Sequence, residues 1–199
     1  MKFLIPVGGV NDPDFGIFTS YKHRGIASGI KSGLAWAGDN CAFSDSFNAE
    51  RFLTWLITMR PYYNTCLFIT VPDELGNATK TQELWRIWYD KISDWPLAFV
   101  CQDGQTPDSI PINCSAVFIG GNTKWKLSQD AIRCIEWGID NNKHIHIGRV
   151  NWWKRYYHFR KLNGSDNFTC DGTRTRYDGV ERTLKEWKKY QTIQYLPEQ

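Results

Sequence analysis

The chain has 199 residues, of which 42% are hydrophobic and 23% charged, and its formal net charge is +3. These values are typical of a single globular domain with a substantial core, and they exclude a disordered or low-complexity chain. The apolar N-terminal run "FLIPV" is too short for a signal peptide or a membrane span. We therefore expect one cytoplasmic domain over residues 1–199, without membrane contact.

Short apolar runs rich in β-forming residues alternate with amphipathic segments along the chain. Seven strands are predicted, at residues 2–8, 34–38, 66–71, 97–101, 116–120, 144–150 and 167–171. Helical periodicity is found around residues 52–57, 84–92, 131–139, 152–162 and 180–187. Ser128 is placed to cap the third of these helices.

Near-continuous apolar strands separated by helices are typical of a parallel sheet that is buried on both faces. The predicted fold is therefore α/β, a compact (β/α) barrel of seven to eight parallel strands in a single domain. A doubly wound open sheet is the alternative, although no Gly-x-Gly-x-x-Gly follows the first strand. Residues 9–33 are rich in Gly and Ser and are predicted to form a long loop, of the kind that is usually functional or mobile.

Six cysteines are spread along the chain, and Cys41, Cys66, Cys101 and Cys170 lie in or beside apolar runs. A free cysteine in such a place behaves as a small hydrophobic side chain. No Cys-x-x-Cys or Cys/His pair has the spacing of metal ligands, so we predict no metal site.

Polar residues follow six of the predicted strands, at the point where each strand ends. They are Asp39-Asn40, Asp73-Glu74, Gln102-Asp103, Gly121-Asn122, Arg149 and Asp171-Gly172. Each one alone could be a turn residue. Together they favour a site, because the carboxyl ends of the strands of a parallel barrel converge on one face. Several carboxylates close together at this face would repel one another, so their pKa values would differ. A nucleophile and an acid/base in one site require such a difference.

Basic residues are concentrated late in the chain. Residues 143–189 contain 12 Lys and Arg against 5 Asp and Glu, whereas the remainder contains 12 against 16. An anionic partner such as a nucleic acid would favour this distribution, although solvated helix faces give the same count. We predict contacts with a nucleic-acid backbone at Lys22, Arg24, Arg149, Lys154, Arg155, Arg174 and Arg176.

Six short motifs follow one another along the chain: "GDNCAFS" (38–44), "ITVPDE" (69–74), "AFVCQDG" (98–104), "VFIGG" (117–121), "IHIGRV" (145–150) and "GSDNFTCDGTRTR" (164–176). In type and order they resemble the tRNA-guanine transglycosylase superfamily, over most of residues 3–176. The short phage and bacterial members, some of which place deazaguanines in DNA, are the most similar. The resemblance implies a (β/α) barrel that replaces guanine in a nucleic acid with a 7-deazaguanine, in the cytoplasm of a bacterium or of a phage-infected host.

The resemblance also implies roles for two carboxylates. Asp171 matches the family's nucleophile, which attacks C1′ of the target nucleotide and holds a covalent glycosyl-enzyme. Asp39 matches the general acid/base that serves the departing and incoming bases. Asp166 is an alternative nucleophile, because the match to the family needs a two-residue shift to reach Asp171.

Base recognition is implied by the same match. Asp73 and Gln102 would hydrogen-bond the edge of the guanine-like ring, and the backbone of Gly120 and Gly121 would lie against it. No metal or organic cofactor is expected, because a pair of carboxylates cleaves the glycosidic bond.

The sequence departs from the family's tRNA enzymes in one respect. Those enzymes carry a zinc site of three cysteines and a histidine near the C-terminus; this sequence has no such cluster, and 28 residues follow Asp171. We therefore expect DNA rather than tRNA as the polymer. An N-glycosidase with water as acceptor, and a non-catalytic nucleic-acid-binding subunit, are the alternative functions. A protein partner or a homodimer is compatible with these expectations.

Overall fold

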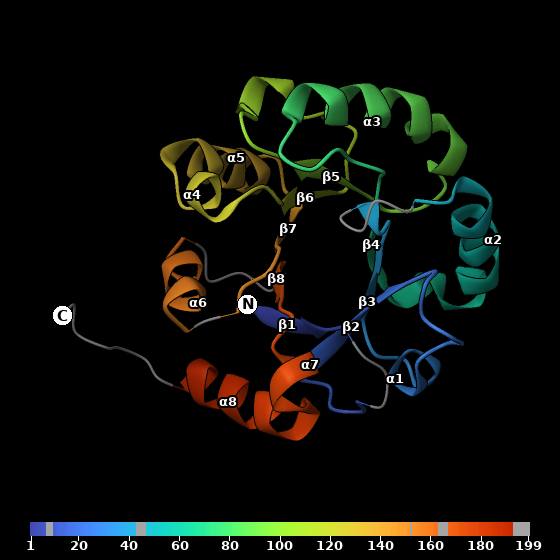
Figure 1. The fold of residues 1–199 in the computed structure, drawn as a ribbon, viewed down its shortest axis with the longest axis vertical. Helices are drawn as coiled ribbons and strands as arrows, with labels where there is room; N and C mark the ends of the chain where they lie inside the picture. The colour runs from blue at the N-terminus through green and yellow to red at the C-terminus, as the bar shows by residue number, and fades with distance from the viewer. Residues whose placement is uncertain (7–9, 43–46, 152, 163–166, 193–199) are drawn as a thin grey trace.

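The computed structural model describes residues 1–6, 10–42, 47–151, 153–162 and 167–192. Eight parallel strands form a closed barrel in chain order, and β8 pairs with β1 to complete it (Figure 1). The strands are β1 (Lys2–Ile5), β2 (Phe15–Ser20), β3 (Trp36–Asp39), β4 (Cys66–Thr70), β5 (Leu97–Cys101), β6 (Ala116–Ile119), β7 (His144–Ile147) and β8 (Phe168–Asp171). The predicted α/β barrel is confirmed, with eight strands.

Helices lie around the outside of the barrel (Figure 1). They are α1 (Ser28–Lys31), α2 (Ala49–Met59), α3 (Ala78–Ile92), α4 (Thr123–Lys126), α5 (Gln129–Asp140), α6 (Trp153–Arg160), α7 (Thr175–Asp178) and α8 (Val180–Thr192), with 3-10 helices η2 (Arg60–Thr65) and η3 (Pro107–Ser109). The five predicted helices correspond to α2, α3, α5, α6 and α8. The predicted cap is present as well, since the backbone N–H of Ala131 donates to the Ser128 hydroxyl.

The prediction of a long loop over residues 9–33 is wrong, because this segment contains β2 and α1. Strand β2 pairs with β1 on one side and with β3 on the other, so it closes a gap that seven strands would leave. Its sequence, FGIFTS, has aromatic and β-branched residues but lies between Gly- and Ser-rich stretches that indicate a loop. Pairing on both edges outweighs that local composition.

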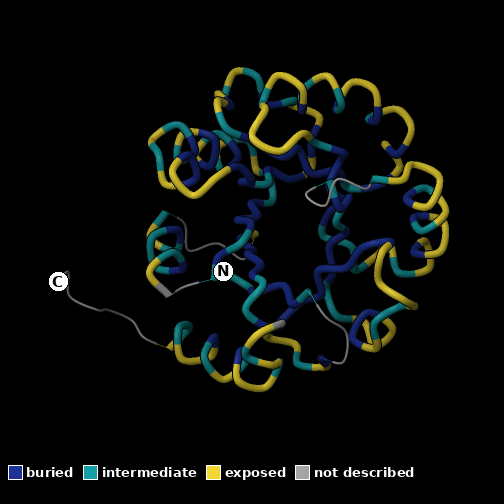
Figure 2. Tube along the Cα trace, in the orientation of Figure 1, coloured by how far each residue is buried: buried dark blue, intermediate teal, exposed yellow. Residues whose placement is uncertain are grey.

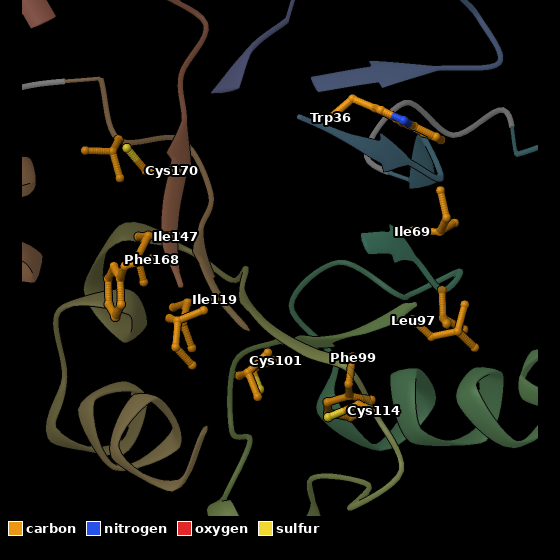
Figure 3. Close-up of a cluster of buried hydrophobic side chains, with 14 of the residues drawn as sticks. Trp36, Ile69, Leu97, Phe99, Cys101, Cys114, Ile119, Ile147, Phe168 and Cys170 are labelled. Carbon is orange, nitrogen blue, oxygen red and sulfur yellow. The ribbon is translucent and has the colours of Figure 1, made fainter. Parts of the chain in front are cut away.

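Side chains along the strands alternate between the barrel interior and its outer face. The interior cluster consists of Leu4, Phe18, Ala37, Phe68, Ala98 and Ala116, with Leu67 and Phe118 packed against it. A larger cluster lies between the strands and the helices; in it the ring of Phe99 lies 5.5 Å from that of Trp85 on α3. Figure 3 shows part of this outer cluster. The strands are accordingly buried, while the outward faces of the helices are exposed (Figure 2).

All six cysteines are free, and five of them are buried, as expected of small hydrophobic side chains. Among the residues that the structure describes, no three His, Cys, Asp or Glu side chains gather in a way that could hold a metal ion. None of the described helices combines the length and apolar character that crossing a membrane requires.

A substitution in β2 tests how tightly this strand is packed against its neighbours. A Cβ atom on Gly16 would lie 2.5 Å from Leu4 Cδ2 and 2.8 Å from the carbonyl oxygen of Ala35. We expect Gly16→Ala to lower the free energy of unfolding by about 1–3 kcal/mol, because the backbone at Ala35, which accepts the Ile17 N–H, cannot move aside freely. Urea denaturation measures this, with Ser28→Ala at an exposed position as the control, expected within about 0.5 kcal/mol of the wild type. Equal effects of the two variants would contradict the tight packing around β2.

Candidate functional site

The carboxyl ends of the strands bring most of the predicted site residues to one rim of the barrel. Asp39 ends β3 and Asp171 ends β8. Strand alternation directs both side chains toward the interior, since each lies two positions after an interior residue, Ala37 and Thr169 respectively. Asp73 follows β4, Gln102 follows β5, Gly120 and Gly121 follow β6, and Arg149 follows β7.

Asp73 and Gln102 are hydrogen-bonded to each other. Gln102 Nε2 donates to Asp73 Oδ2 over 2.5 Å, and Asn40 Nδ2 donates to Asp73 Oδ1 over 2.7 Å. Gln102 Oε1 accepts from the backbone N–H groups of Gly76, at 3.0 Å, and Gly121, at 2.9 Å. These contacts fix the orientation of the Gln102 amide. Burial raises the pKa of Asp73, while the Asn40 and Gln102 donors oppose that change.

The two glycines after β6 are packed against this pair. A Cβ atom on Gly120 would lie 3.0 Å from Gln102 Nε2, and one on Gly121 would lie 2.4 Å from Asp103 Oδ1. Gly121 also has a φ of +67°, in the left-handed region that favours glycine. Its carbonyl oxygen accepts from Arg149 Nη2 over 2.8 Å, so the loop after β6 is tied to the loop after β7.

Asp39 is half-buried at the rim and has an elevated pKa. Burial raises the pKa of its carboxyl group to about 6, and the neighbouring carboxylates of Asp73 and Asp171 add to the increase. The backbone N–H of Cys41 donates to Asp39 Oδ1 over 3.1 Å and opposes it. A pKa near 6 lets one carboxyl group both donate and accept a proton close to neutral pH.

Asp171 is almost fully buried, and its contacts are concentrated on one oxygen. Oδ1 accepts from the backbone N–H of Arg149, at 2.8 Å, and lies 3.2 Å from His146 Nε2. The structure gives Oδ2 no hydrogen bond from any residue that it describes. One carboxylate oxygen is thus held in place, while the other has its lone pairs available.

Two left-handed residues hold the two carboxylates. Among the described residues other than glycine, only Cys41, Asn142 and Arg149 have a positive φ. The backbone N–H of Cys41 donates to Asp39, and that of Arg149 donates to Asp171. Non-glycine residues rarely adopt this conformation, and it costs about 1–3 kcal/mol where they do. Both strained positions serve the same purpose, which is to direct an N–H group at a carboxylate.

The predicted basic residues are placed unequally. Arg149 lies at the rim, and Arg155 is anchored beside it by bonds to the Arg149 carbonyl and the Thr123 hydroxyl, each 3.2 Å long. Lys22 lies near enough to lower the pKa of Asp39, and its side chain is exposed, as are those of Arg24 and Lys154.

Arg174 differs from the other basic residues. It forms ion pairs with Asp178, at 2.7 Å, and with Glu186, at 3.0 Å, so its charge is balanced within the chain. Neither the side chain of Arg176 nor the alternative nucleophile Asp166 belongs to the part of the chain that is described.

Sequence reasoning missed two buried groups beside Asp171. The first is His146, whose pairing could have been anticipated because it lies in register with Thr169 on the next strand, two residues before Asp171. The second is Lys126, a buried amine on α4 that donates to the Gly148 carbonyl. Burial and the charge of Arg149 lower the pKa of Lys126 to about 7. No sequence pattern marks it, since it is one lysine in a short polar helix.

A cavity of about 80 Å³ opens at the carboxyl end of β2, where Phe18, Thr19, His23 and Arg24 contribute to its lining. Asp39, Asp73 and Asp171 do not line it. Sites for small molecules usually measure about 300–1,000 Å³, so this cavity is too small to hold a purine base. It adds a small polar recess next to the carboxylate rim.

The elevated pKa of Asp39 predicts that this residue destabilises the protein at neutral pH. The folded state binds the proton more tightly than the unfolded state, so the stability that Asp39 contributes is present below pH 3.8 and is lost as the pH rises past 6. Asn at this position still accepts from the Cys41 N–H but cannot ionise. We expect Asp39→Asn to raise the free energy of unfolding at pH 7 by about 1–3 kcal/mol, with the gain shrinking toward pH 4.

Urea denaturation at several pH values measures this effect. The control is Asp108→Asn, at an exposed position on η3, which should change stability by less than about 0.5 kcal/mol. A loss of stability in Asp39→Asn at pH 7 would contradict the assignment of Asp39 as a carboxyl group with a raised pKa.

Comparison of the sequence with protein-family models and with curated proteins found no match to either. The features that point to a function are the motifs of the sequence and the arrangement of Asp39, Asp73, Gln102 and Asp171 at the barrel rim.

Proposed function

We propose that this protein is a base-exchange glycosyltransferase that replaces guanine in a nucleic acid with a 7-deazaguanine. The observation that carries the proposal is the placement of three carboxylates and one oriented amide at the same rim of the barrel. Asp171 has one oxygen fixed and one without a described hydrogen bond, and Asp39 has a pKa near 6. This combination supplies a nucleophile and an acid/base in one site.

In the first half-reaction, Asp171 attacks C1′ of the target nucleotide through Oδ2. A bond forms between Oδ2 and C1′ as the bond from C1′ to guanine N9 breaks, and the electron pair of that bond leaves with guanine. Protonated Asp39 delivers a proton to the departing base. The product is free guanine and a covalent glycosyl ester of Asp171, which keeps the sugar activated until the new base arrives.

The second half-reaction reverses these steps with a different base. Asp39, now ionised, accepts the N9 proton of the incoming 7-deazaguanine. The N9 lone pair attacks C1′, and Asp171 leaves as a carboxylate. Because Asp39 acts first as an acid and then as a base, a pKa of about 6 suits both roles near neutral pH.

Asp73 and Gln102 have hydrogen-bonding capacity that matches a guanine-like ring. The Asp73 oxygens each accept one bond within the protein and can accept more, while Gln102 Nε2 has a second N–H group beyond the one given to Asp73. Guanine presents a donating amino group and N1–H beside the acceptor O6. The Asp73 carboxylate would accept from the amino group and N1–H, and the Gln102 amide would donate to O6. A 7-deazaguanine presents the same groups on this edge.

The polymer would be held by cations around the rim. Lys22, Arg24, Arg149, Lys154 and Arg155 provide positive charge on the segments that follow β2 and β7. Phosphate contacts of this kind orient a nucleic acid without reading its sequence and weaken as salt increases. We propose DNA as the polymer, following the likeness to the transglycosylases of phages. Arg174 is left out of this path because Asp178 and Glu186 already balance its charge.

Incorporation of labelled guanine into DNA tests the proposal directly. We expect the wild-type protein to exchange the label with DNA guanine, and Asp171→Asn to lower the rate at least about a thousandfold because an amide is a poor nucleophile. Asp108→Asn is the matched control and should retain the wild-type rate. Exchange by Asp171→Asn at the wild-type rate would show that Asp171 is not the nucleophile.

The same assay distinguishes the alternative functions. Release of free guanine without incorporation of label would indicate an N-glycosidase with water as acceptor. Salt-sensitive DNA binding without turnover, unaffected by Asp39→Ala or Asp171→Ala, would indicate a non-catalytic binding subunit. Exchange in tRNA but not in DNA would keep the reaction and change the polymer.

A further inference from the structure

A chain of hydrogen bonds runs through the barrel interior and ends on Asp171. His144 Nε2 lies 2.8 Å from Thr169 Oγ1, and the same oxygen lies 2.8 Å from His146 Nδ1. His146 Nε2 in turn lies 3.2 Å from Asp171 Oδ1. The register of β7 and β8 places His146 beside Thr169. His144 and His146 on β7, and Thr169 and Asp171 on β8, are each two residues apart, so their side chains share one face of the sheet.

The chain lies in apolar surroundings. The rings of Phe18, Phe68 and Phe118 have centroids 5.3, 5.1 and 4.5 Å from that of His146. His146 has no exposed surface, and burial lowers its pKa. Burial also lowers the pKa of His144, to about 3. At neutral pH both rings are therefore neutral, and each has one donor and one acceptor nitrogen.

Neutral rings favour one arrangement of protons along this chain, because the Thr169 hydroxyl lies 2.8 Å from His146 Nδ1 but 3.5 Å from its other acceptor, the Ile145 carbonyl oxygen. Asp171 Oδ1 accepts from the Arg149 N–H, so it is an acceptor and His146 donates to it through Nε2. His146 Nδ1 then has a lone pair and accepts the hydroxyl proton of Thr169. Because that hydroxyl has a single proton, His144 must donate to Thr169 Oγ1 through Nε2.

We propose that His146, oriented by Thr169 and His144, is a positioning residue for the nucleophile. It holds Asp171 Oδ1 together with the Arg149 N–H and leaves Oδ2 as the oxygen that attacks C1′. Asp171 determines which nitrogen of His146 has the proton, and the Thr169 hydroxyl supports that tautomer by donating to Nδ1, while His144 donates to Thr169 Oγ1. The role in attack rests on the proposed function; the arrangement of protons does not.

Other charged groups act on the same ring. Asp171 raises the pKa of His146 and Lys126, from α4, lowers it, while the rings of Phe18, Phe68 and Phe118 add no charge. Since burial is the largest influence and lowers the pKa, we expect His146 to be neutral at neutral pH. The pH dependence of the reaction should then come from other groups, Asp39 first among them.

Nitrogen NMR of the four histidines tests the arrangement without any assay of activity. The His146 signals are assigned through their loss in His146→Gln. In the wild-type protein at neutral pH, this ring should have its proton on Nε2 and none on Nδ1. Thr169→Ser should retain this pattern, whereas Thr169→Val, which has no hydroxyl, should lose the hydrogen-bond shift at Nδ1. A wild-type proton on Nδ1 would overturn the inference even if a variant failed to fold.

Single-turnover base exchange tests the role in positioning. We expect Thr169→Val to slow the chemical step about tenfold to a hundredfold with little change in the KM for DNA, and Thr169→Ser to remain within about threefold of the wild type. Equal rates and equal pH profiles for the two variants would overturn the positioning role. If the wild-type protein shows no base exchange, the proposed function is wrong. The NMR measurement would still test the proton arrangement independently.

Discussion

The pairing of β8 with β1 is the constraint on which the site depends. It closes the barrel and sets Asp171 beside Leu4 in register, with Thr169 beside Lys2. Closure makes all eight carboxyl ends meet at one rim, so residues far apart in the sequence share a small area. The separate pairing of β7 with β8 lines up His146 with Thr169. Without closure, β1 and β8 would be opposite edges of an open sheet, and Asp171 on β8 would lie far from Asp39 on β3.

Backbone hydrogen bonds fix the main polar side chains of the site. Each of the two proposed catalytic carboxylates is held by a backbone N–H from a residue in the left-handed region, Cys41 for Asp39 and Arg149 for Asp171. Gln102 is fixed by two backbone donors in the same way. Strain and buried polar groups of this kind lower stability, and they persist where the surrounding fold determines them. The expected gain in stability on removing the Asp39 charge follows from the same trade-off.

The sequence predicted the barrel and the rim residues because both depend on short-range patterns. Apolar strands and the Asp39, Asp73, Gln102 and Asp171 strand ends are visible one segment at a time. Strand β2 was missed because its identity comes from pairing with β1 and β3, which local composition does not record. The ion pair of Arg174 with Glu186 was also hidden, since it depends on how α8 packs beside α7, whereas the pair with Asp178 has ordinary i,i+4 spacing.

The most direct test of the account is the identity of the residue that becomes attached to the nucleic acid. Guanine-containing DNA would be mixed with the protein, the reaction quenched before the second base is added, and the digested protein analysed by peptide mass spectrometry. We expect a nucleotide mass on the peptide that contains Asp171, and on the Asp171 side chain when that peptide is fragmented. Attachment at Asp166, Asp39 or any other residue would contradict it.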